Sequence, residues 1–160
     1  MSDQLFYRRQ VKDFAEFEAE FSERVRQAVL CVAASIEPQG RPRTRILHPI
    51  WQGTTGWVST HRHSMKSQHL AHSPYLSLAY AADPLKPVYV DCKAEFMDDL
   101  TSKKSVWDLA LGTPEPVGYD PALDYISYDN PTYGVLKLTP WRIEVYSLGI
   151  GTKIWKARPE

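Results

Sequence analysis

The chain has 160 residues, of which 43% are hydrophobic, 12% aromatic and 24% charged, a composition typical of a folded domain with a core. Nineteen basic and nineteen acidic residues give a formal net charge of zero, which excludes a chain-wide electrostatic footprint for nucleic acid. No signal-like segment opens the chain and no apolar run is long enough to span a membrane. We therefore expect a single cytoplasmic domain over residues 1–160.

The first predicted element is a helix over residues 13–28. Its apolar side chains recur at spacings of three and four residues, and Asp13 with Glu16 matches the capping pair that often opens a helix. Three predicted strands follow, separated by turns that contain glycine, and they cover residues 29–36, 41–51 and 57–61.

The hydrophobic period changes after residue 61. Ser64 is a candidate N-cap and Pro74 is a stop signal, and together they predict a short helix over about residues 64–72. The next predicted elements are two strands and a second peripheral helix, at residues 75–82, 88–96 and 98–111.

Residues 112–133 contain four prolines and four tyrosines and predict a loop long enough to be functional or to serve as an interface arm. Two closing strands are predicted at residues 134–138 and 141–148, with Pro140 in the turn between them, and the tail beyond could add an edge strand. Together the elements predict a mainly β (α+β) fold, a largely antiparallel barrel of six to seven strands with a leading helix and two peripheral helices.

The segment STHRHSMKSQHLAHSPYLSLAY, residues 59–80, carries the main chemical signal. A helix N-terminus offers unpaired N–H groups and partial positive charge, to which Ser64 adds a hydroxyl and Lys66 a full charge. Arg43 and Arg45 alternate on the preceding strand, so they share a face, and their planar guanidinium groups suit phosphate oxygens. These side chains predict a phosphomonoester cup. On spacing alone, a solvated strand face beside a simple cap stays open as an alternative.

The same segment contains four of the five histidines, and they are His61, His63, His69 and His72. A metal cluster is geometrically possible, but the HExxH spacing is missing and no carboxylate lies between residues 38 and 82. We therefore expect exposed loop and helix histidines rather than a metal site.

Other catalytic signatures are missing from the sequence, including GxSxG, GxGxxG and GxxxxGK[ST]. Cys31 and Cys92 lie far apart inside apolar strand-like runs. We expect both to be buried, reduced thiols.

Six segments, taken in order, resemble the pyridoxamine 5'-phosphate oxidase-like flavin proteins. They are RTRILHPIW, WVST, SMKSQHLAHSP, YLSLAY, CKAEF and GVLKLTPWRIEVYSL. With the leading helix, the resemblance runs from about residue 13 to residue 150. It implies an antiparallel split β-barrel, a flavin mononucleotide (FMN) cofactor, and a homodimer with flavin sites at its interface.

The resemblance also implies cofactor contacts. The implied phosphate contacts are Arg45, Ser64 and Lys66. The implied contacts to the isoalloxazine ring are Ile46, Leu47, His48, Ser59 and Thr60, together with Tyr146 acting across the subunit interface. It assigns no catalytic residue, and His48 and Tyr146 are candidates only if they face the ring.

Met65 and Pro87 depart from the oxidases, which tend to carry a phosphate-binding arginine and a ring-contacting glutamine near these positions. The tail GIGTKIWKARPE lacks the arginine and histidine motif that holds pyridoxal phosphate. We therefore expect a flavin-dependent oxidoreductase that transfers a hydride to or from another small molecule. The alternatives are a 5-deazaflavin-dependent reductase on the same fold, with Arg62 near the longer cofactor tail, and a non-enzymatic flavin or haem binding protein.

Overall fold

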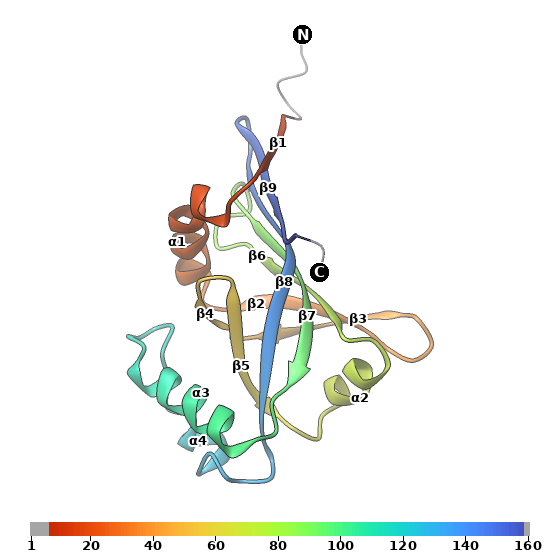
Figure 1. The fold of residues 1–160 in the computed structure, drawn as a ribbon, viewed down its shortest axis with the longest axis vertical. Helices are drawn as coiled ribbons and strands as arrows, with labels where there is room; N and C mark the ends of the chain where they lie inside the picture. Colours follow the sequence, from red (N-terminus) through yellow and green to blue (C-terminus); the bar gives the residue numbers. More distant parts are fainter. Residues whose placement is uncertain (1–6, 159–160) are drawn as a thin grey trace.

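The structure is a computed structural model that describes residues 7–158, and these residues form one nine-stranded sheet. The strands follow the order β1-β9-β8-β7-β6-β2-β3, while β5 pairs with β8 and β4 pairs with β5 (Figure 1). Their bounds are β1 Arg8–Val11, β2 Cys31–Ile36, β3 Pro42–Leu47, β4 Ile50–Gln52, β5 Thr55–His61, β6 Tyr75–Tyr80, β7 Val88–Phe96, β8 Tyr133–Ser147 and β9 Gly151–Lys156. In Figure 1, β2 and β3 run nearly crosswise to β5 and β8, so the sheet curls without closing.

Neighbouring strands are antiparallel except at one edge, where β1 runs parallel to β9. The prediction of a mainly β (α+β), largely antiparallel fold is confirmed, and the strand count of six to seven is corrected to nine. The short, polar sequence RRQV of β1 has no strand-like alternation of its own. It becomes a strand because β9, far along the chain, supplies its hydrogen-bonding partner.

Four α-helices and one 3-10 helix lie outside the sheet in the described part of the chain. They are η2 Phe14–Glu16, α1 Glu18–Ala28, α2 Met65–His72, α3 Leu100–Gly112 and α4 Ala122–Tyr125. The predicted leading helix is split, because the capping box of Asp13 and Glu16 opens the 3-10 turn and α1 begins only after Phe17. In Figure 1, α1 and α3 lie on one side of the sheet and α2 on the other.

β8 is one long strand that passes through Pro140, where we predicted a turn. Pro140 pairs with Cys92 and Arg142 pairs with Asp91, which leaves Trp141 as an extra residue on β8. Such a bulge already interrupts the ladder, so a residue without an N–H group is tolerated there.

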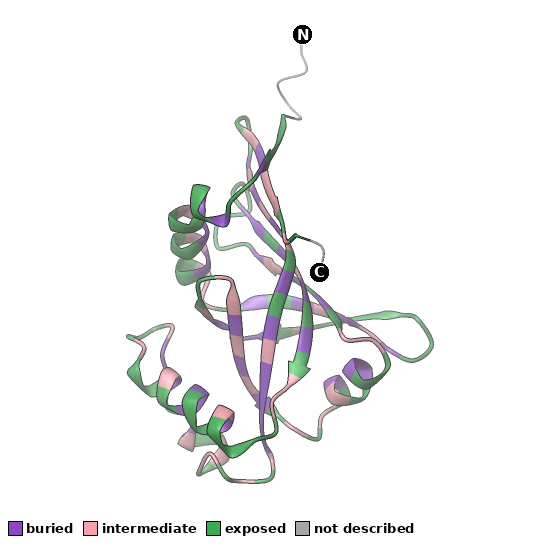
Figure 2. Cartoon of the chain, in the orientation of Figure 1, coloured by how far each residue is buried: buried purple, intermediate pink, exposed green. Residues whose placement is uncertain are grey.

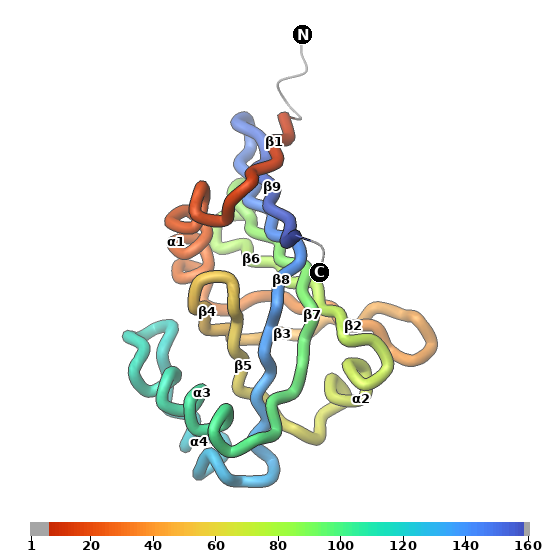
Figure 3. Tube along the Cα trace, in the orientation of Figure 1, coloured from red at the N-terminus to blue at the C-terminus, as the bar shows by residue number. Residues whose placement is uncertain are grey.

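The single strand predicted over residues 41–51 is also two strands, β3 and β4, because His48 and Pro49 lie outside the ladder. The β2–β3 hairpin projects to the same side as α2, as the tube in Figure 3 shows, and α2 packs against β2. This arrangement places the start of α2 beside the strand that carries Arg45.

The main core fills the space between the leading helices and the inner face of the sheet. Phe14 and Phe21 meet edge to face with ring centroids 5.5 Å apart. Figure 2 shows buried residues on the side of α1 that faces the sheet and alternating along the strands. Cys31 and Cys92 belong to this core as free thiols, which confirms their prediction.

The 112–133 segment, predicted as a loop, contains α4 and folds back onto the sheet. Its amide group at Tyr119 donates to the Ala110 carbonyl oxygen over 3.0 Å, and Tyr125 packs with its ring centroid 5.0 Å from that of Tyr133. Leu123 and Ile126 project outward and are 86% and 80% exposed. The segment is therefore anchored at both ends and exposed at its tip.

Candidate functional site

The candidate site begins at the N-terminus of α2. Ser64 occupies the N-cap with an extended backbone (φ −96°, ψ 167°), which confirms the predicted helix start, but its hydroxyl makes no capping bond to the helix. Lys66 follows in the first turn and is only 6% exposed. The first helical turn adds unpaired N–H groups and a partial positive charge to this place.

The Lys66 ammonium lies between two hydroxyl groups. Its Nζ donates to Thr60 Oγ1 on β5 over 2.6 Å and to Ser64 Oγ over 3.3 Å. Both acceptors are neutral, so they satisfy two of the three ammonium protons without balancing the charge. Burial, and secondarily the positive charge of Arg45, lower the pKa of Lys66 from 10.5 to about 8. The site therefore holds a cation at an electrostatic cost.

Arg45 approaches the same region from β3. Its Nη1 donates to Ser35 Oγ over 2.6 Å, and its Nη2 lies 3.3 Å from His69 Nδ1. Burial lowers the pKa of Arg45, and the positive charge of Arg43 lowers it further. Arg43 itself is exposed on the strand, so only one of the two predicted arginines enters the cluster.

Two cations thus converge without a carboxylate. Among residues 7–158, neither Arg45 nor Lys66 takes part in an ion pair. Buried charge without a counter-ion is unfavourable, and a ligand that brings negative charge relieves it. A phosphate monoester carries nearly two negative charges at neutral pH and several strong acceptor oxygens. The donor set of this cluster therefore fits the phosphate group of FMN.

The structure separates the predicted ring contacts on and next to β3. Leu47 is buried in the core on the same face of the strand as Arg45, whereas Ile46 points to the outer face and is 60% exposed. What these residues share is a continuous stretch of backbone beside the cluster, rather than a common side-chain surface.

His48 lies just beyond β3 and packs against the 112–133 segment. Its ring centroid is 4.6 Å from that of Tyr119. Burial lowers the pKa of His48, partly opposed by a backbone hydrogen bond with Val117, so the imidazole is neutral at pH 7. The His48 Nε2 atom is buried and has no hydrogen-bond partner among the described residues. His48 therefore keeps an unused nitrogen near the end of β3.

Ser59 and Thr60 are neighbours on β5 and face opposite ways. Thr60 joins the cluster through Lys66, as described above. Ser59 Oγ instead lies 3.0 Å from Tyr133 Oη, in the second, smaller core, and burial raises the pKa of Tyr133 to about 12. Thr60 therefore lies in the cluster with Lys66, whereas the side chain of Ser59 lies in the second core.

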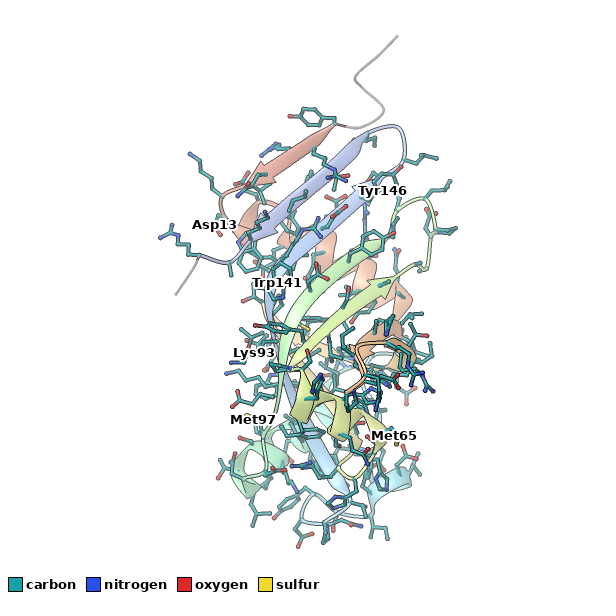
Figure 4. All side chains as sticks on the ribbon, turned by 90° about the vertical axis from the view of Figure 1, so that its right-hand side faces the viewer. Asp13, Met65, Lys93, Met97, Trp141 and Tyr146 are labelled. Atoms are coloured by element: carbon teal, nitrogen blue, oxygen red, sulfur yellow. The ribbon has the colours of Figure 1, made fainter. Side chains whose placement is uncertain are left out.

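Tyr146 lies far from the cluster within one chain. The strand partner of Thr60 is Gly134, and Tyr146 is twelve positions further along β8, or roughly 35–40 Å at the usual rise of a strand. Figure 4 shows Tyr146 near one end of the sheet and Met65, the first residue of α2, toward the other. Tyr146 can thus approach this site only from another copy of the chain.

The histidines do not gather at one place. His61, His63 and His72 are exposed, but His69 is 3% exposed and its Nδ1 lies 2.8 Å from Ser35 Oγ. The expectation that all these histidines are exposed is therefore wrong for His69. In the part of the chain that the structure describes, no three His, Cys, Asp or Glu side chains are grouped as metal ligands.

Two members of the cluster, Ser35 and His69, were missed from the sequence. Each carried a weak signal. Ser35 is a polar residue at an inward position of an apolar strand, in phase with Cys31. His69 follows Lys66 by three residues, so both lie on one face of the helix. Neither pattern alone identifies Arg45 as the shared partner.

Comparison with known families and structures agrees with this geometry. Residues 17–146 match the family model described as pyridoxamine 5'-phosphate oxidase. None of the curated proteins compared shows significant similarity to the chain. Across residues 7–158, no helix has both the length and the apolarity needed to cross a membrane.

Solved structures share the fold at low sequence identity. A Clostridium acetobutylicum protein related to general stress protein 26 is 18% identical with a TM-score of 0.72, covering 90% of this chain and 96% of its own. An FMN-binding protein related to pyridoxamine 5'-phosphate oxidase, from Nostoc punctiforme, is 16% identical with a TM-score of 0.64, covering 89% and 97%. An F420 reductase is 13% identical with a TM-score of 0.57, covering 76% and 94%. The predicted split-barrel fold is therefore confirmed.

Proposed function

The chain belongs to the pyridoxamine 5'-phosphate oxidase family, and on that premise we propose that it is an FMN-binding oxidoreductase. The observation that carries this proposal is the convergence of Arg45 and Lys66 without a counter-carboxylate in residues 7–158. A site with this charge is prepared for a phosphate group before the ligand arrives.

The chain's own residues have distinct roles in this proposal. Lys66 and Arg45 bind the phosphate, while the hydroxyl groups of Ser64 and Thr60 orient the Lys66 ammonium and add hydrogen bonds. The backbone around Ile46, with Leu47 and His48 beside it, and the facing strand at Ser59 border the ring. When bound, FMN supplies the two-electron chemistry, and the protein supplies binding, orientation and exclusion of water.

The reaction that we propose is hydride transfer to or from a small molecule other than pyridoxamine 5'-phosphate. Met65 stands where the oxidases tend to carry a phosphate-binding arginine, and its side chain is 63% exposed. An uncharged thioether at this place cannot pair with a phosphate oxygen. The tail GIGTKIWKARPE also lacks the arginine and histidine motif that holds pyridoxal phosphate in the oxidases, so the substrate is expected to differ from theirs.

We also propose that the protein is a homodimer. In register across four neighbouring strands, Ile46, Val32, Ala79 and Tyr89 form a row on the outer face of the sheet. Ile46, Val32 and Tyr89 are 60%, 44% and 40% exposed, which is unusual for a run of apolar side chains facing water. A second copy covering this row would also give Tyr146 a route to the other chain's cofactor.

The dimer is tested by mass photometry or analytical ultracentrifugation. Val32→Glu should convert the dimer to a monomer, because it buries a charge in the proposed interface. The matched control is Leu123→Glu on α4, which is 86% exposed and away from the row. A wild-type monomer, or a dimer unaffected by Val32→Glu, refutes the proposal.

FMN binding is tested by titrating the ligand-free protein with FMN and with riboflavin, which has the same ring but no phosphate. FMN should bind at one per chain with the two visible bands of an oxidised flavin, and at least about tenfold more tightly than riboflavin. Equal affinities would show that the ring alone drives binding and that the phosphate site is wrong.

A second candidate is reduction with the 5-deazaflavin coenzyme, which the likeness to an F420 reductase favours at the level of the fold. This coenzyme also carries a phosphate, so the same cluster would serve it. Identifying the small molecule that copurifies with the protein, by absorbance and mass, separates the two. One visible band at shorter wavelength than the flavin bands would favour the deazaflavin.

A further inference from the structure

A buried imidazole and a hydroxyl group hold the arginine of the anion site. Arg45 Nη1 donates to Ser35 Oγ over 2.6 Å, and Arg45 Nη2 lies 3.3 Å from His69 Nδ1. We propose that His69, together with Ser35, is a positioning residue that aims the Arg45 guanidinium at the ligand phosphate. This inference rests on the proposed FMN function and adds to it residues outside the contacts implied by the family resemblance.

Neutral acceptors orient an arginine without cancelling its charge. A carboxylate in place of Ser35 or His69 would hold the Arg45 guanidinium more tightly, but it would also neutralise the charge that attracts phosphate. Ser35 is fully buried and His69 is 3% exposed, so water does not compete for the guanidinium protons on that side. The remaining guanidinium donors stay available for an anion.

The proposal assigns a tautomer to the His69 imidazole from the hydrogen-bond distances. Ser35 Oγ accepts from Arg45, so its own proton is free to go to His69 Nδ1, 2.8 Å away. In our proposal His69 Nδ1 accepts from both groups, and the ring proton is on Nε2.

Helix α2 thereby helps to position both cations, Lys66 and Arg45. Lys66 and His69 are three residues apart on α2, on the face directed at the sheet, and both are buried. Lys66 reaches β5 through Thr60, while His69 reaches β2 and β3 through Ser35 and Arg45. The position of α2 therefore determines the spacing of the two charges that would grip one phosphate.

Two substitutions at His69 separate positioning from packing. His69→Asn places the amide oxygen close to where Nδ1 lies, so the acceptor is kept. His69→Leu keeps apolar bulk but removes the acceptor. We expect FMN affinity to fall about tenfold or more in His69→Leu and to stay within about threefold of wild type in His69→Asn. His72→Leu, an exposed site on the same helix, is the control and should bind as wild type does.

The circular dichroism spectrum and thermal midpoint of each variant establish that it folds. Folded His69→Leu with wild-type affinity overturns the proposal, and so does His69→Asn that binds as poorly as His69→Leu. Should either variant fail to fold, Ser35→Ala takes its place, with a loss of affinity expected and no loss overturning the proposal.

Failure of the FMN function would look different, because the wild type itself would then not bind FMN. In that case the ligand-free protein still tests the positioning role. Two-bond ¹H–¹⁵N spectra of wild-type His69 should show the Nε2–H tautomer with a hydrogen-bonded Nδ1. A proton on Nδ1 would overturn the proposal whatever the cofactor is.

Discussion

Replacing Lys66 by methionine should stabilise the ligand-free protein while weakening its hold on FMN. Methionine keeps the length and apolar bulk of the lysine stem and removes only the ammonium group. The pKa of Lys66 is lowered from 10.5 to about 8, chiefly by burial. At ~1.36 kcal/mol for each pH unit, keeping this group charged at pH 7 costs roughly 3 kcal/mol.

The lost hydrogen bonds to Thr60 and Ser64 offset part of that gain, at about 1 kcal/mol each. We therefore expect Lys66→Met to raise the free energy of unfolding of the ligand-free protein by about 1 kcal/mol at pH 7. The same change removes a charge-assisted contact to phosphate worth ~1.5–3 kcal/mol, so FMN should bind about 10- to 150-fold more weakly.

Urea unfolding of the ligand-free protein measures the first effect, and quenching of FMN fluorescence on titration measures the second. Lys86→Met, at an exposed position in the turn between β6 and β7, is the matched control and should leave both quantities unchanged. A Lys66→Met protein that is less stable than wild type and binds FMN equally well would refute the reasoning. Lys66 would then be a structural residue rather than part of an anion site.

Three further predictions follow from the same structure. FMN affinity should fall as the pH rises through about 8, because Lys66 loses its proton in the free protein, and isothermal titration should find this dependence abolished in Lys66→Met. Burial raises the pKa of Cys31 to about 11 and that of Cys92 to about 12. Ellman's reagent at pH 8 should therefore label neither thiol in the folded protein and both thiols in guanidinium. Rapid labelling of the native protein would contradict their burial. Gly118→Ala should lower the free energy of unfolding by roughly 2–4 kcal/mol in a denaturation assay, since the added Cβ would lie 1.7 Å from a backbone oxygen. The control is Gly112→Ala, at the end of α3 with open space around it, which should be neutral or slightly stabilising in the same assay.

Local signals in the sequence predicted the elements that local forces form. β7 matches the predicted bounds of residues 88–96, and α2 begins at the N-cap that Ser64 predicted. The prediction of a turn at Pro140 was wrong because the bulge that accommodates this proline depends on β7, a separate part of the chain. β1 was missed for the same kind of reason, since β9 alone makes it a strand.

The candidate site divides in the same way. Lys66 and Ser64 are only two residues apart in the sequence, so the pattern of a helix start was enough to propose them. Ser35 and His69 enter only through Arg45, which lies ten residues from one and twenty-four from the other. Nothing in single-residue spacing specifies that hairpin and helix meet there, because packing between distant segments decides it.

The position of β3 at the end of the strand order has a consequence for handling the protein. An edge strand exposes unpaired backbone groups that invite other chains to add to the sheet, and charges and proline on such a strand prevent this. β3 begins with Pro42 and carries Arg43 and Arg45. Arginine-to-leucine changes made here to study ligand binding would also remove protection against aggregation, so light scattering should accompany every affinity measured on them.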